Sequence, residues 1–158
     1  MNKKEVKRFT VDDVYVSVLK ADIIKHKNGW IHVREKEKMF KPTGSVLMDI
    51  VGQVLLEYNS LSAKGLAESV GADAAALAGT FRWLTGMTLH EFLIQYRMKQ
   101  VCEWLTCTDI TIKEIARRCG FSSQASLAHL FAQKFACSPT QYRKQHRPKN
   151  YAELYKWE

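Results

Sequence analysis

Hydrophobic positions recur at helical spacing through most of the chain after residue 44. From Ser45 the apolar residues return every three or four positions, which predicts an amphipathic helix ending near Asn59-Ser60. Its expected apolar stripe comprises Val46, Leu47, Ile50, Val54, Leu55 and Tyr58. A longer helix is predicted to open at the capping box Thr88-Leu-His-Glu91 and to end near Leu105. No strand is needed after residue 44, so the fold class is mainly α.

The first 44 residues follow a period of two instead. Val14–Leu19 alternates and continues to Ile23-Ile24, and Trp30–Val33 resumes the alternation after Asn28-Gly29. Alternation indicates half-buried strands, and Asn-Gly tolerates the positive φ angles of a two-residue hairpin turn. We therefore predict a small N-terminal β-hairpin, followed by a linker at residues 41–44.

One supersecondary unit occurs twice in the chain, about 50 residues apart. The aligned positions are Leu66-Ala67-x3-Gly71 with Ile115-Ala116-x3-Gly120, and Leu77, Phe81 and Phe92 with Leu127, Phe131 and Tyr142. In each copy the alanine permits a close helix crossing, and the glycine can take the left-handed conformation of a tight turn. The repeat predicts two helix-turn-helix subdomains, each a homeodomain-like three-helix unit, joined by a long linker helix.

Capping signals are densest in the second copy. Thr111-Ile-Lys-Glu114 is a capping box, Gly120 is expected to end that helix, and Ser122 or Ser123 can cap the next. Ser138-Pro139 gives an N-cap followed by proline at the first helical position. The buried stripe of the second helix is predicted to be Leu127, Leu130, Phe131 and Phe135.

These patterns divide the chain into an N-terminal extension at 1–44, a double helix-turn-helix domain at 45–147 and a tail at 148–158. Within the domain we define lobe one as 45–87, the linker helix as 88–105 and lobe two as 110–147. The linker helix should be about 27 Å long, which suits two units about 34 Å apart along a duplex. The aromatic tail is expected to pack on lobe two rather than to serve as a docking peptide.

The charge of the chain is unevenly distributed. Of its 158 residues, 24 are Lys or Arg and 16 are Asp or Glu, for a net charge of +8. Residues 1–44 carry +5, residues 45–109 carry −3 and residues 110–158 carry +6. A polyanion is therefore expected to bind mainly through the C-terminal third.

Several classes of protein are excluded. No apolar run approaches the ~18 residues of a membrane span, and no signal sequence is recognised, so we expect a cytoplasmic protein without a membrane partner. The four cysteines, at 102, 107, 119 and 137, suit neither a zinc site nor a disulfide framework. They are expected to be small buried residues, with a redox pair of Cys102 and Cys107 as the alternative. No catalytic motif is present, so neither an enzyme, a cofactor nor a metal is predicted.

The motifs of lobe two resemble the DNA-binding domain of the AraC/XylS family of bacterial transcription regulators. The resemblance is carried by Ile115-Ala-Arg-Arg-Cys-Gly-Phe121, Leu127-x3-Phe131 and Phe135-x3-Pro139-x2-Tyr142-Arg143. It extends from about Ser45 to Arg147 and implies an all-helical bilobal domain. Each lobe would place one recognition helix in successive segments of the major groove.

The resemblance also implies candidate DNA contacts. The predicted base-contacting residues on the recognition helix of lobe two are Ser123, Gln124, Ala125, Ala128 and His129. Glutamine can pair with adenine, serine and histidine can reach purine edges or phosphate, and alanine methyls can touch thymine methyls. The predicted phosphate-contacting residues are Ser122, Arg117, Arg118, Lys134, Arg143, Lys144, Lys64 and Arg82.

Lobe one departs from the family pattern. Many members carry Arg two residues before the core Phe of each recognition helix, where this chain has Gly79 and His129. The first recognition helix, Asp73–Thr80, offers mostly methyl groups and a glycine. It could approach the groove closely through alanine contacts with thymine methyls. Alternatively, lobe one has lost base readout and serves as a packing or protein-contact module, which the −3 charge of residues 45–109 favours.

The sequence predicts a sequence-specific DNA-binding transcriptional regulator of the AraC type. The alternative is a protein-interaction adaptor or anti-regulator that keeps the double helix-turn-helix shape with weakened DNA readout. The expected partner is double-stranded DNA, with RNA polymerase as a further candidate. The 44 N-terminal residues are too few for the family's effector-binding domain, so no small-molecule effector is expected. The hairpin could cover the helical core, contact phosphates or mediate a dimer through an edge strand, and a monomer is the other possibility.

Overall fold

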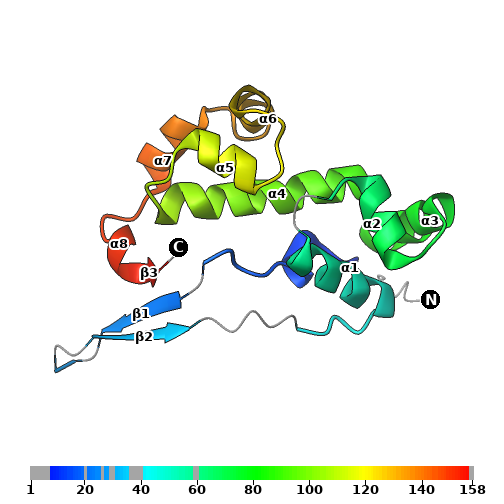
Figure 1. Ribbon diagram of the computed structural model, residues 1–158, viewed down its shortest axis with the longest axis horizontal. Helices are drawn as coiled ribbons and strands as arrows, with labels where there is room; N and C mark the ends of the chain where they lie inside the picture. The colour runs from blue at the N-terminus through cyan, green and yellow to red at the C-terminus, as the bar shows by residue number, and fades with distance from the viewer. Residues whose placement is uncertain are drawn as a thin grey trace, which may run out of the picture. The chain divides into compact units, whose positions relative to one another are not determined.

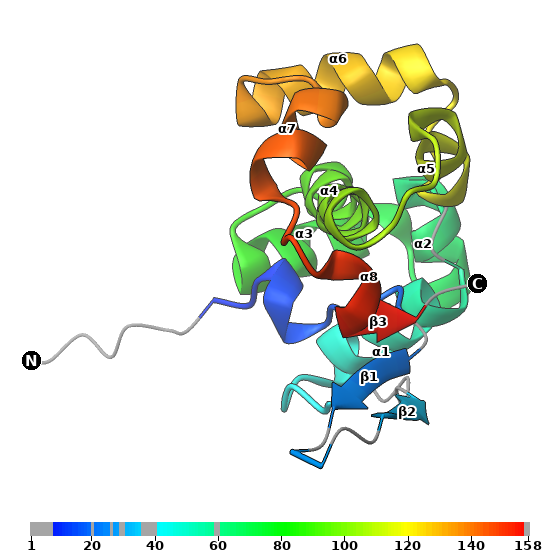
Figure 2. The ribbon, with the colours of Figure 1, turned by 90° about the vertical axis from the view of Figure 1, so that its left-hand side faces the viewer.

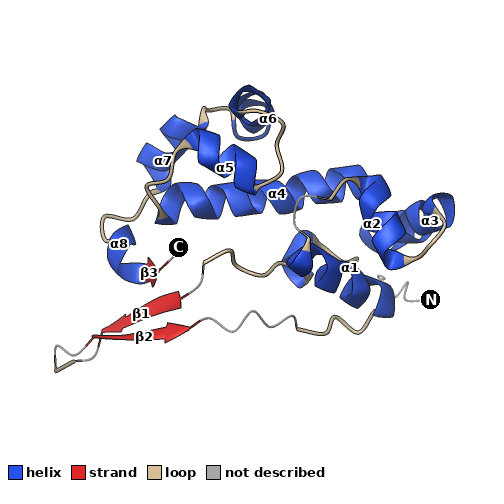
Figure 3. Cartoon of the chain, viewed as in Figure 1, coloured by secondary structure: helices blue, strands red, loops and turns tan. Residues whose placement is uncertain are grey.

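The computed structural model describes residues 8–19, 21–25, 27–28, 31–35, 41–58 and 61–156. Over these ranges the chain is mainly helical, as predicted (Figures 1 and 3). In chain order the elements are a 3-10 helix η1 (Val11–Asp13), β1 (Ala21–Lys25), β2 (Ile31–Glu35), α1 (Val46–Glu57), α2 (Ala63–Val70), α3 (Ala74–Thr85), α4 (Leu89–Cys107), α5 (Ile112–Arg118), α6 (Gln124–Phe135), α7 (Pro139–His146), α8 (Tyr151–Leu154) and β3 (Tyr155–Lys156).

The chain forms two compact units. The first unit consists of Met1–Tyr15 with Phe40–Tyr96, and the second of Val16–Met39 with Arg97–Glu158. Helix α4 therefore contributes its first turns to the first unit and its remaining turns to the second. The two copies of the sequence repeat fall in different units, α2 and α3 in the first and α5 and α6 in the second.

The first unit is built around the apolar faces of α1 to α3 and the start of α4. Its core residues with no exposed surface include Met48, Val51, Leu66, Phe81 and Phe92. The rings of Phe81 and Phe92 meet edge to face, with centroids 4.9 Å apart. Gly71, the C-cap of α2, has a φ angle of 72°. The left-handed turn predicted from the repeat is thus confirmed.

The predicted apolar stripe of α1 was wrong in part. Val46, Ile50 and Tyr58 are 77%, 40% and 57% exposed, whereas Met48 and Val51 are fully buried. Helix α1 carries apolar residues on almost every side, so spacing alone could not choose its inward face. Packing against α2 decided it. The expected helix end at Asn59-Ser60 lies outside the described residues, and α1 ends at Glu57.

The strand predicted over Val14–Leu19 does not form. Val11 to Asp13 make one 3-10 turn, and residues 15–19 have no regular structure. Val14 is nevertheless buried, because with Val11 it belongs to the core of the first unit, while Tyr15, Val16 and Val18 are half-buried. Further along, the backbone N–H of Val18 donates to Glu103 Oε2 at 3.2 Å, and Leu19 is 1% exposed. Individual packing against helices, rather than strand pairing, explains the alternating pattern.

A small antiparallel sheet belongs to the second unit (Figure 2). Strands β1 and β2 pair in a register that runs from Ala21 opposite Glu35 to Lys25 opposite Ile31. On its other edge β1 pairs with the C-terminal strand β3, where Asp22 lies opposite Tyr155. Gly29 and Trp30 of the predicted hairpin, and Trp157 of the tail, lie outside the described residues. The sheet therefore pairs a segment of the N-terminal extension with the C-terminal tail.

In the second unit α6 packs against α5 and α7, while α5 and α7 contact the C-terminal part of α4. Leu127 and Phe131 of α6 are fully buried, as predicted, while Phe135 remains 38% exposed. The ring of Phe131 lies tilted by 31° against Phe135 and meets Tyr142 edge to face, at centroid distances of 4.4 and 5.3 Å. This aromatic cluster fixes α7 against α6.

The predicted helix starts of lobe two are confirmed by short hydrogen bonds. The Ser123 hydroxyl accepts the backbone N–H of Ser126 at 3.0 Å, and Ser138 forms a reciprocal capping box with Gln141. The capping box at the start of α4 is also present, since Thr88 and Glu91 exchange bonds of 2.8 and 3.1 Å. Each cap satisfies an otherwise unpaired N–H group in the first turn.

The end of α6 leads to a stability prediction. Its C-cap is Ala136, which has a φ angle of 55°, whereas the equivalent cap of α3 is Gly86 at 75°. A side chain in the left-handed region costs about 1 kcal/mol, which glycine avoids. We expect Ala136→Gly to raise the free energy of unfolding by about 0.5–1 kcal/mol, measured by urea denaturation.

The matched control is Gly86→Ala. A Cβ added at Gly86 would lie 2.7 Å from Arg8 Nη1, so this substitution combines backbone strain with a steric contact. It should lower the free energy of unfolding. A loss of stability in Ala136→Gly would show that the Ala136 methyl contributes packing worth more than the strain.

Candidate nucleic-acid interface

Helix α6 presents a polar surface opposite its buried side. Leu127 and Phe131 point into the core of the second unit and hold the helix in a fixed rotation. The sequence-predicted residues Ser122, Ser123, Gln124, Ala125 and His129 are all exposed, and Ala128 is half-buried. The structure therefore places the predicted base-contacting residues on one short helix and its N-terminal turn.

An open hollow of about 640 Å³ lies between α5 and the start of α6. Its lining combines backbone and hydroxyl donors at the helix start with basic side chains: Thr111, Lys113, Glu114, Ala116, Arg117, Phe121, Ser122, Ser123, Gln124 and Ala125. A helix N-terminus carries a partial positive charge and unpaired N–H groups. The surroundings of the hollow therefore suit an anionic group next to α6.

Glu114 counteracts part of this positive charge. Its carboxylate accepts hydrogen bonds from Arg117 Nε at 2.9 Å and Nη2 at 2.5 Å, and from Arg118 Nε at 2.8 Å. These bonds lower the pKa of Glu114 to about 2, so the carboxylate stays ionised near neutral pH. Arg117 is 72% exposed, whereas the Arg118 side chain is 24% exposed and lies over the Trp104 ring. The backbone N–H of Glu114 is capped by Thr111, which the sequence predicted.

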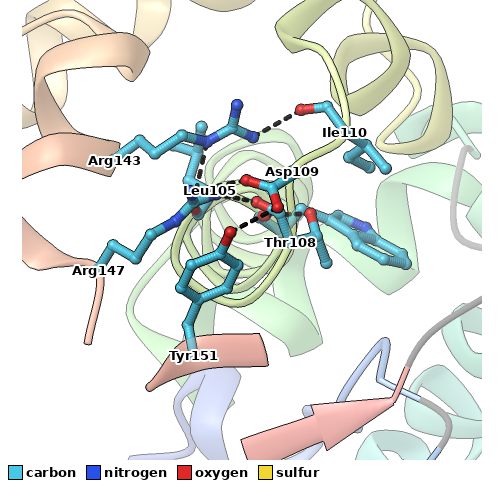
Figure 4. A network of polar contacts seen from close by, with 8 residues as sticks. Leu105, Thr108, Asp109, Ile110, Arg143, Arg147 and Tyr151 are labelled. Carbon is cyan, nitrogen blue, oxygen red and sulfur yellow. Dashed lines mark hydrogen bonds and ion pairs between the residues drawn. The ribbon is translucent and has the colours of Figure 1, made fainter. Parts of the chain in front are cut away.

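Arg143, predicted to contact phosphate, donates hydrogen bonds to two backbone carbonyls of the second unit (Figure 4). Its Nε donates to the carbonyl oxygen of Leu105 at 3.2 Å and its Nη2 to that of Ile110 at 2.6 Å. Burial of the guanidinium lowers the pKa of Arg143. The side chain thereby links α7 to the end of α4 and to the following loop. It also satisfies carbonyl groups of Leu105 and Ile110 that have no hydrogen-bond partner within a helix.

Arg147 and Tyr151 extend this network, which no motif in the sequence indicated. Arg147 Nη1 bonds Asp109 Oδ1 at 2.7 Å, and its Nη2 donates to the carbonyl of Thr108. The Tyr151 hydroxyl donates to the other oxygen of Asp109, which with Arg147 lowers the pKa of that carboxyl. The Arg147 guanidinium lies 3.9 Å from the centre of the Tyr151 ring (Figure 4). The start of the tail is thus fixed to lobe two.

The other predicted phosphate contacts are exposed lysine and arginine side chains. In the second unit, Lys134 lies in the last turn of α6 and Lys144 in that of α7. In the first unit, Arg82 is exposed on α3, and the 86% exposed Lys64 lies 3.9 Å from Glu68. These four side chains keep an accessible positive charge.

Helix α3 differs from α6 on its outer face. Ala75, Gly79 and Arg82 are exposed there, and Trp83 is 68% exposed. A Cβ added at Gly79 would meet no atom within 4 Å, so packing within the chain does not require a glycine at this position. The sequence reasoning missed Trp83, although its alignment with Gln133 in the repeat would have singled it out. Apart from Arg82, the outer face of α3 in lobe one is apolar, whereas the outer face of α6 in lobe two is polar.

All four cysteines of the chain are free thiols. Cys107 and Cys119 are buried, and burial raises the pKa of Cys119 to about 12. Cys102 and Cys107 lie five positions apart on α4, which turns them about 140° away from each other. The alternative redox pair is therefore unsupported. Among the described residues, no three His, Cys, Asp or Glu side chains gather in a way that could hold a metal ion.

Two consecutive helix-turn-helix units with a long intervening helix define this chain as a double helix-turn-helix protein. A family model described as a helix-turn-helix domain matches residues 66–145, about half of the chain. The chain belongs to the AraC/XylS family of transcription regulators, as the resemblance implied.

Curated relatives are similar over this same region. An uncharacterized helix-turn-helix transcriptional regulator of Staphylococcus aureus strain COL is 38% identical over 86 residues, which is 54% of this chain and 12% of that protein. The urease operon transcriptional activator of Escherichia coli is 32% identical over 65 residues, 41% of this chain and 22% of that protein. The chain thus spans less than a quarter of the length of these relatives.

Solved structures share the fold. The DNA-binding domain of AdpA, a global transcriptional factor crystallised with a target DNA, is 29% identical with a TM-score of 0.58, over 62% of this chain and 89% of that one. The C-terminal domain of AraT, a response regulator from Geobacillus stearothermophilus, is 24% identical with a TM-score of 0.63, over 70% of this chain and 94% of that one. In the described part of this chain, no helix has the length and apolar character of a membrane span.

Proposed function

We propose that this chain is a sequence-specific DNA-binding transcription regulator that reads the major groove mainly through α6. The observation that carries the proposal is the geometry of this helix. Leu127 and Phe131 fix its inner side, while Ser123, Gln124, Ala125 and His129 stand on its exposed start and outer face with Ala128 beside them. These groups offer hydrogen bonds and methyl contacts to base edges.

The electrostatics of lobe two support the same function. Residues 110–158 carry a net charge of +6, and neutralisation of phosphates supplies much of the affinity in DNA binding. The proposed phosphate contacts are Ser122, Arg117, Lys134 and Lys144, with Arg118 beside them and Lys64 and Arg82 on lobe one. Arg143 is left out because its guanidinium bonds two backbone carbonyls. The similar DNA-binding domain of AdpA was crystallised with a target DNA, which supports DNA as the partner.

A second function is favoured by one specific observation. Apart from Arg82, the outer face of α3 is apolar. It carries the exposed Trp83 and Gly79, a position where packing within the chain does not require glycine. Such a face suits a protein contact better than base readout. An adaptor or anti-regulator that keeps the double helix-turn-helix shape would use this face, and RNA polymerase is a candidate partner. Such a protein would keep only weakened DNA readout and would enrich no sequence from a random duplex pool.

The finer organisation is part of the same proposal. The DNA-binding part is assigned to 45–147, with a β extension before it and a tail after it. The regulator acts in the cytoplasm as a monomer or as a dimer formed through the N-terminal strands, which sedimentation at increasing protein concentration distinguishes.

The test is an in vitro selection of the purified chain against a random duplex pool. We expect enrichment of one sequence box, and binding to that box should weaken steeply with salt because bound phosphates release counterions. Two enriched boxes about ten base pairs apart would show that lobe one also reads bases. Enrichment of no sequence would overturn the proposal in favour of the adaptor.

Glu114→Gln is expected to strengthen DNA binding. Removal of the carboxylate releases the two nearby guanidinium groups, and the exposed Arg117 can then pair with phosphate. The affinity should rise about two- to fivefold, and the slope of log K against log salt should steepen by about one unit. Fluorescence anisotropy over a salt series measures both quantities.

The matched control for this prediction is Glu57→Gln. It removes the same charge from an exposed carboxylate on α1 that accepts a hydrogen bond from Gln53, so no proposed phosphate contact is released. If the affinity rises equally in both variants, the effect comes from net charge, and Arg117 is not released specifically.

A further inference from the structure

His129 does not stand alone on the outer face of α6. The side chain of Gln133, one turn later, lies with its Nε2 3.2 Å from His129 Nε2. Both residues are exposed, and residues four positions apart on a helix face the same side. The sequence reasoning named His129 as a candidate reader and missed Gln133, although their i,i+4 spacing was visible.

The chemistry of this pair determines where the imidazole carries its proton. An amide nitrogen only donates, so a contact between Gln133 Nε2 and His129 Nε2 requires the ring nitrogen to accept. A neutral imidazole that accepts at Nε2 carries its proton at Nδ1. An imidazolium donates at both nitrogens and could not form this bond. The free N–H of His129 is therefore the one at Nδ1.

We propose that Gln133 is a positioning residue that holds His129 as the Nδ1–H tautomer and makes it a hydrogen-bond donor to a base. This inference rests on the proposed function of α6. A donor in the major groove selects an acceptor edge. Guanine offers two acceptors, N7 and O6, adenine and thymine offer one each, N7 and O4, and cytosine offers only a donor. His129 is accordingly assigned to guanine on the contacted strand, the base with two acceptors, and excludes cytosine.

The repeat supports a dedicated role for the pair. The positions of lobe one that align with His129 and Gln133 are Gly79 and Trp83, which can form no such bond. Within α6, the other exposed residues one turn from His129 are Ala125 and Ala132, which have no polar side-chain atoms, and Ser126, whose hydroxyl lies 3.0 Å from that of Ser122. The hydrogen bond to Gln133 is thus the polar side-chain contact through which α6 orients its histidine.

The first arm of the test measures the tautomer in the free full-length chain. Long-range ¹H–¹⁵N correlation spectra at about pH 8, where exposed histidines are neutral, distinguish a protonated from an unprotonated ring nitrogen, and His129→Ala assigns the signals. We expect the Nδ1–H form in the unmodified chain. Gln133→Met should restore the Nε2–H form that free imidazole side chains prefer. An Nε2–H form in the unmodified chain, or no change in Gln133→Met, would overturn the inference.

The second arm repeats the duplex selection with Gln133→Met. We expect the variant to enrich the same sequence box. At one position of that box, the preference for guanine over the other bases should fall about tenfold. The control is Gln53→Met, which removes an equivalent exposed glutamine, 3.0 Å from Glu57, on α1. An identical box from both Gln133→Met and the unmodified chain would overturn the inference and leave the proposed function intact. If the unmodified chain enriches no sequence, the proposed function fails, and the inference fails with it.

Discussion

The double substitution Gln124→Ala with His129→Ala should lower the affinity for the selected duplex by about two orders of magnitude. Each side chain stands exposed at the start or on the outer face of α6, and a well-placed base contact contributes about 1–3 kcal/mol of discrimination. Both side chains are formally neutral, so the salt dependence of binding should stay nearly unchanged. Affinity for random duplex should also remain. Anisotropy titrations with selected and random duplexes over a salt series measure these quantities.

The same pair of residue types provides the control. Gln53 and His90 are exposed on α1 and α4 in the first unit, away from the proposed reading helix in sequence. Gln53→Ala with His90→Ala should leave the affinity for the selected duplex within about twofold. Equal losses in the two double variants would mean that α6 does not provide the base contacts.

Arg143→Ala should destabilise the second unit rather than remove a phosphate contact. The half-buried guanidinium donates to Leu105 and Ile110, and its loss leaves two carbonyl oxygens without these partners. Hydrogen bonds from charged groups contribute about 1.5–3 kcal/mol, so the free energy of unfolding should fall by about 2–3 kcal/mol. Arg143→Lys should recover only part of this, because an ammonium cannot span both carbonyls in the planar geometry of arginine. Urea denaturation gives the stabilities.

Its neighbour Lys144 is the natural control. Lys144 is exposed in the last turn of α7, so Lys144→Ala should change the free energy of unfolding by less than about 0.5 kcal/mol. In DNA binding it should weaken affinity and reduce the salt slope by about one unit. The assignment of Arg143 fails if Arg143→Ala shows the behaviour expected of Lys144→Ala.

The helical frame of this protein could be predicted from local signals. Caps such as Ser123 with Ser126 and Ser138 with Gln141 join residues three positions apart, so the information lies within one turn. The left-handed glycine at position 71 follows from sterics alone. The repeat then showed that the same unit is built twice. These features sufficed for the mainly α fold and for the polar outer face of α6.

Features that depend on distant partners could not be predicted. Arginine 143 looked like a phosphate ligand because it is basic and follows the family motif, but its partners lie 33 and 38 positions earlier in the chain. Several partners for this side chain were compatible with the sequence, and only the packing of the helices selected these two carbonyls.

Local sequence signals specify which segments are helical, where most of the helices begin, that the unit occurs twice and which side chains of α6 face outward. These properties arise from backbone sterics and from contacts within a few residues. Tertiary structure alone decided which side of α1 is buried, that residues 14–19 pack without forming a strand, and that Arg143 binds backbone carbonyls. These outcomes depend on burial against elements distant in sequence, whose free energy exceeds the local preference of the segment.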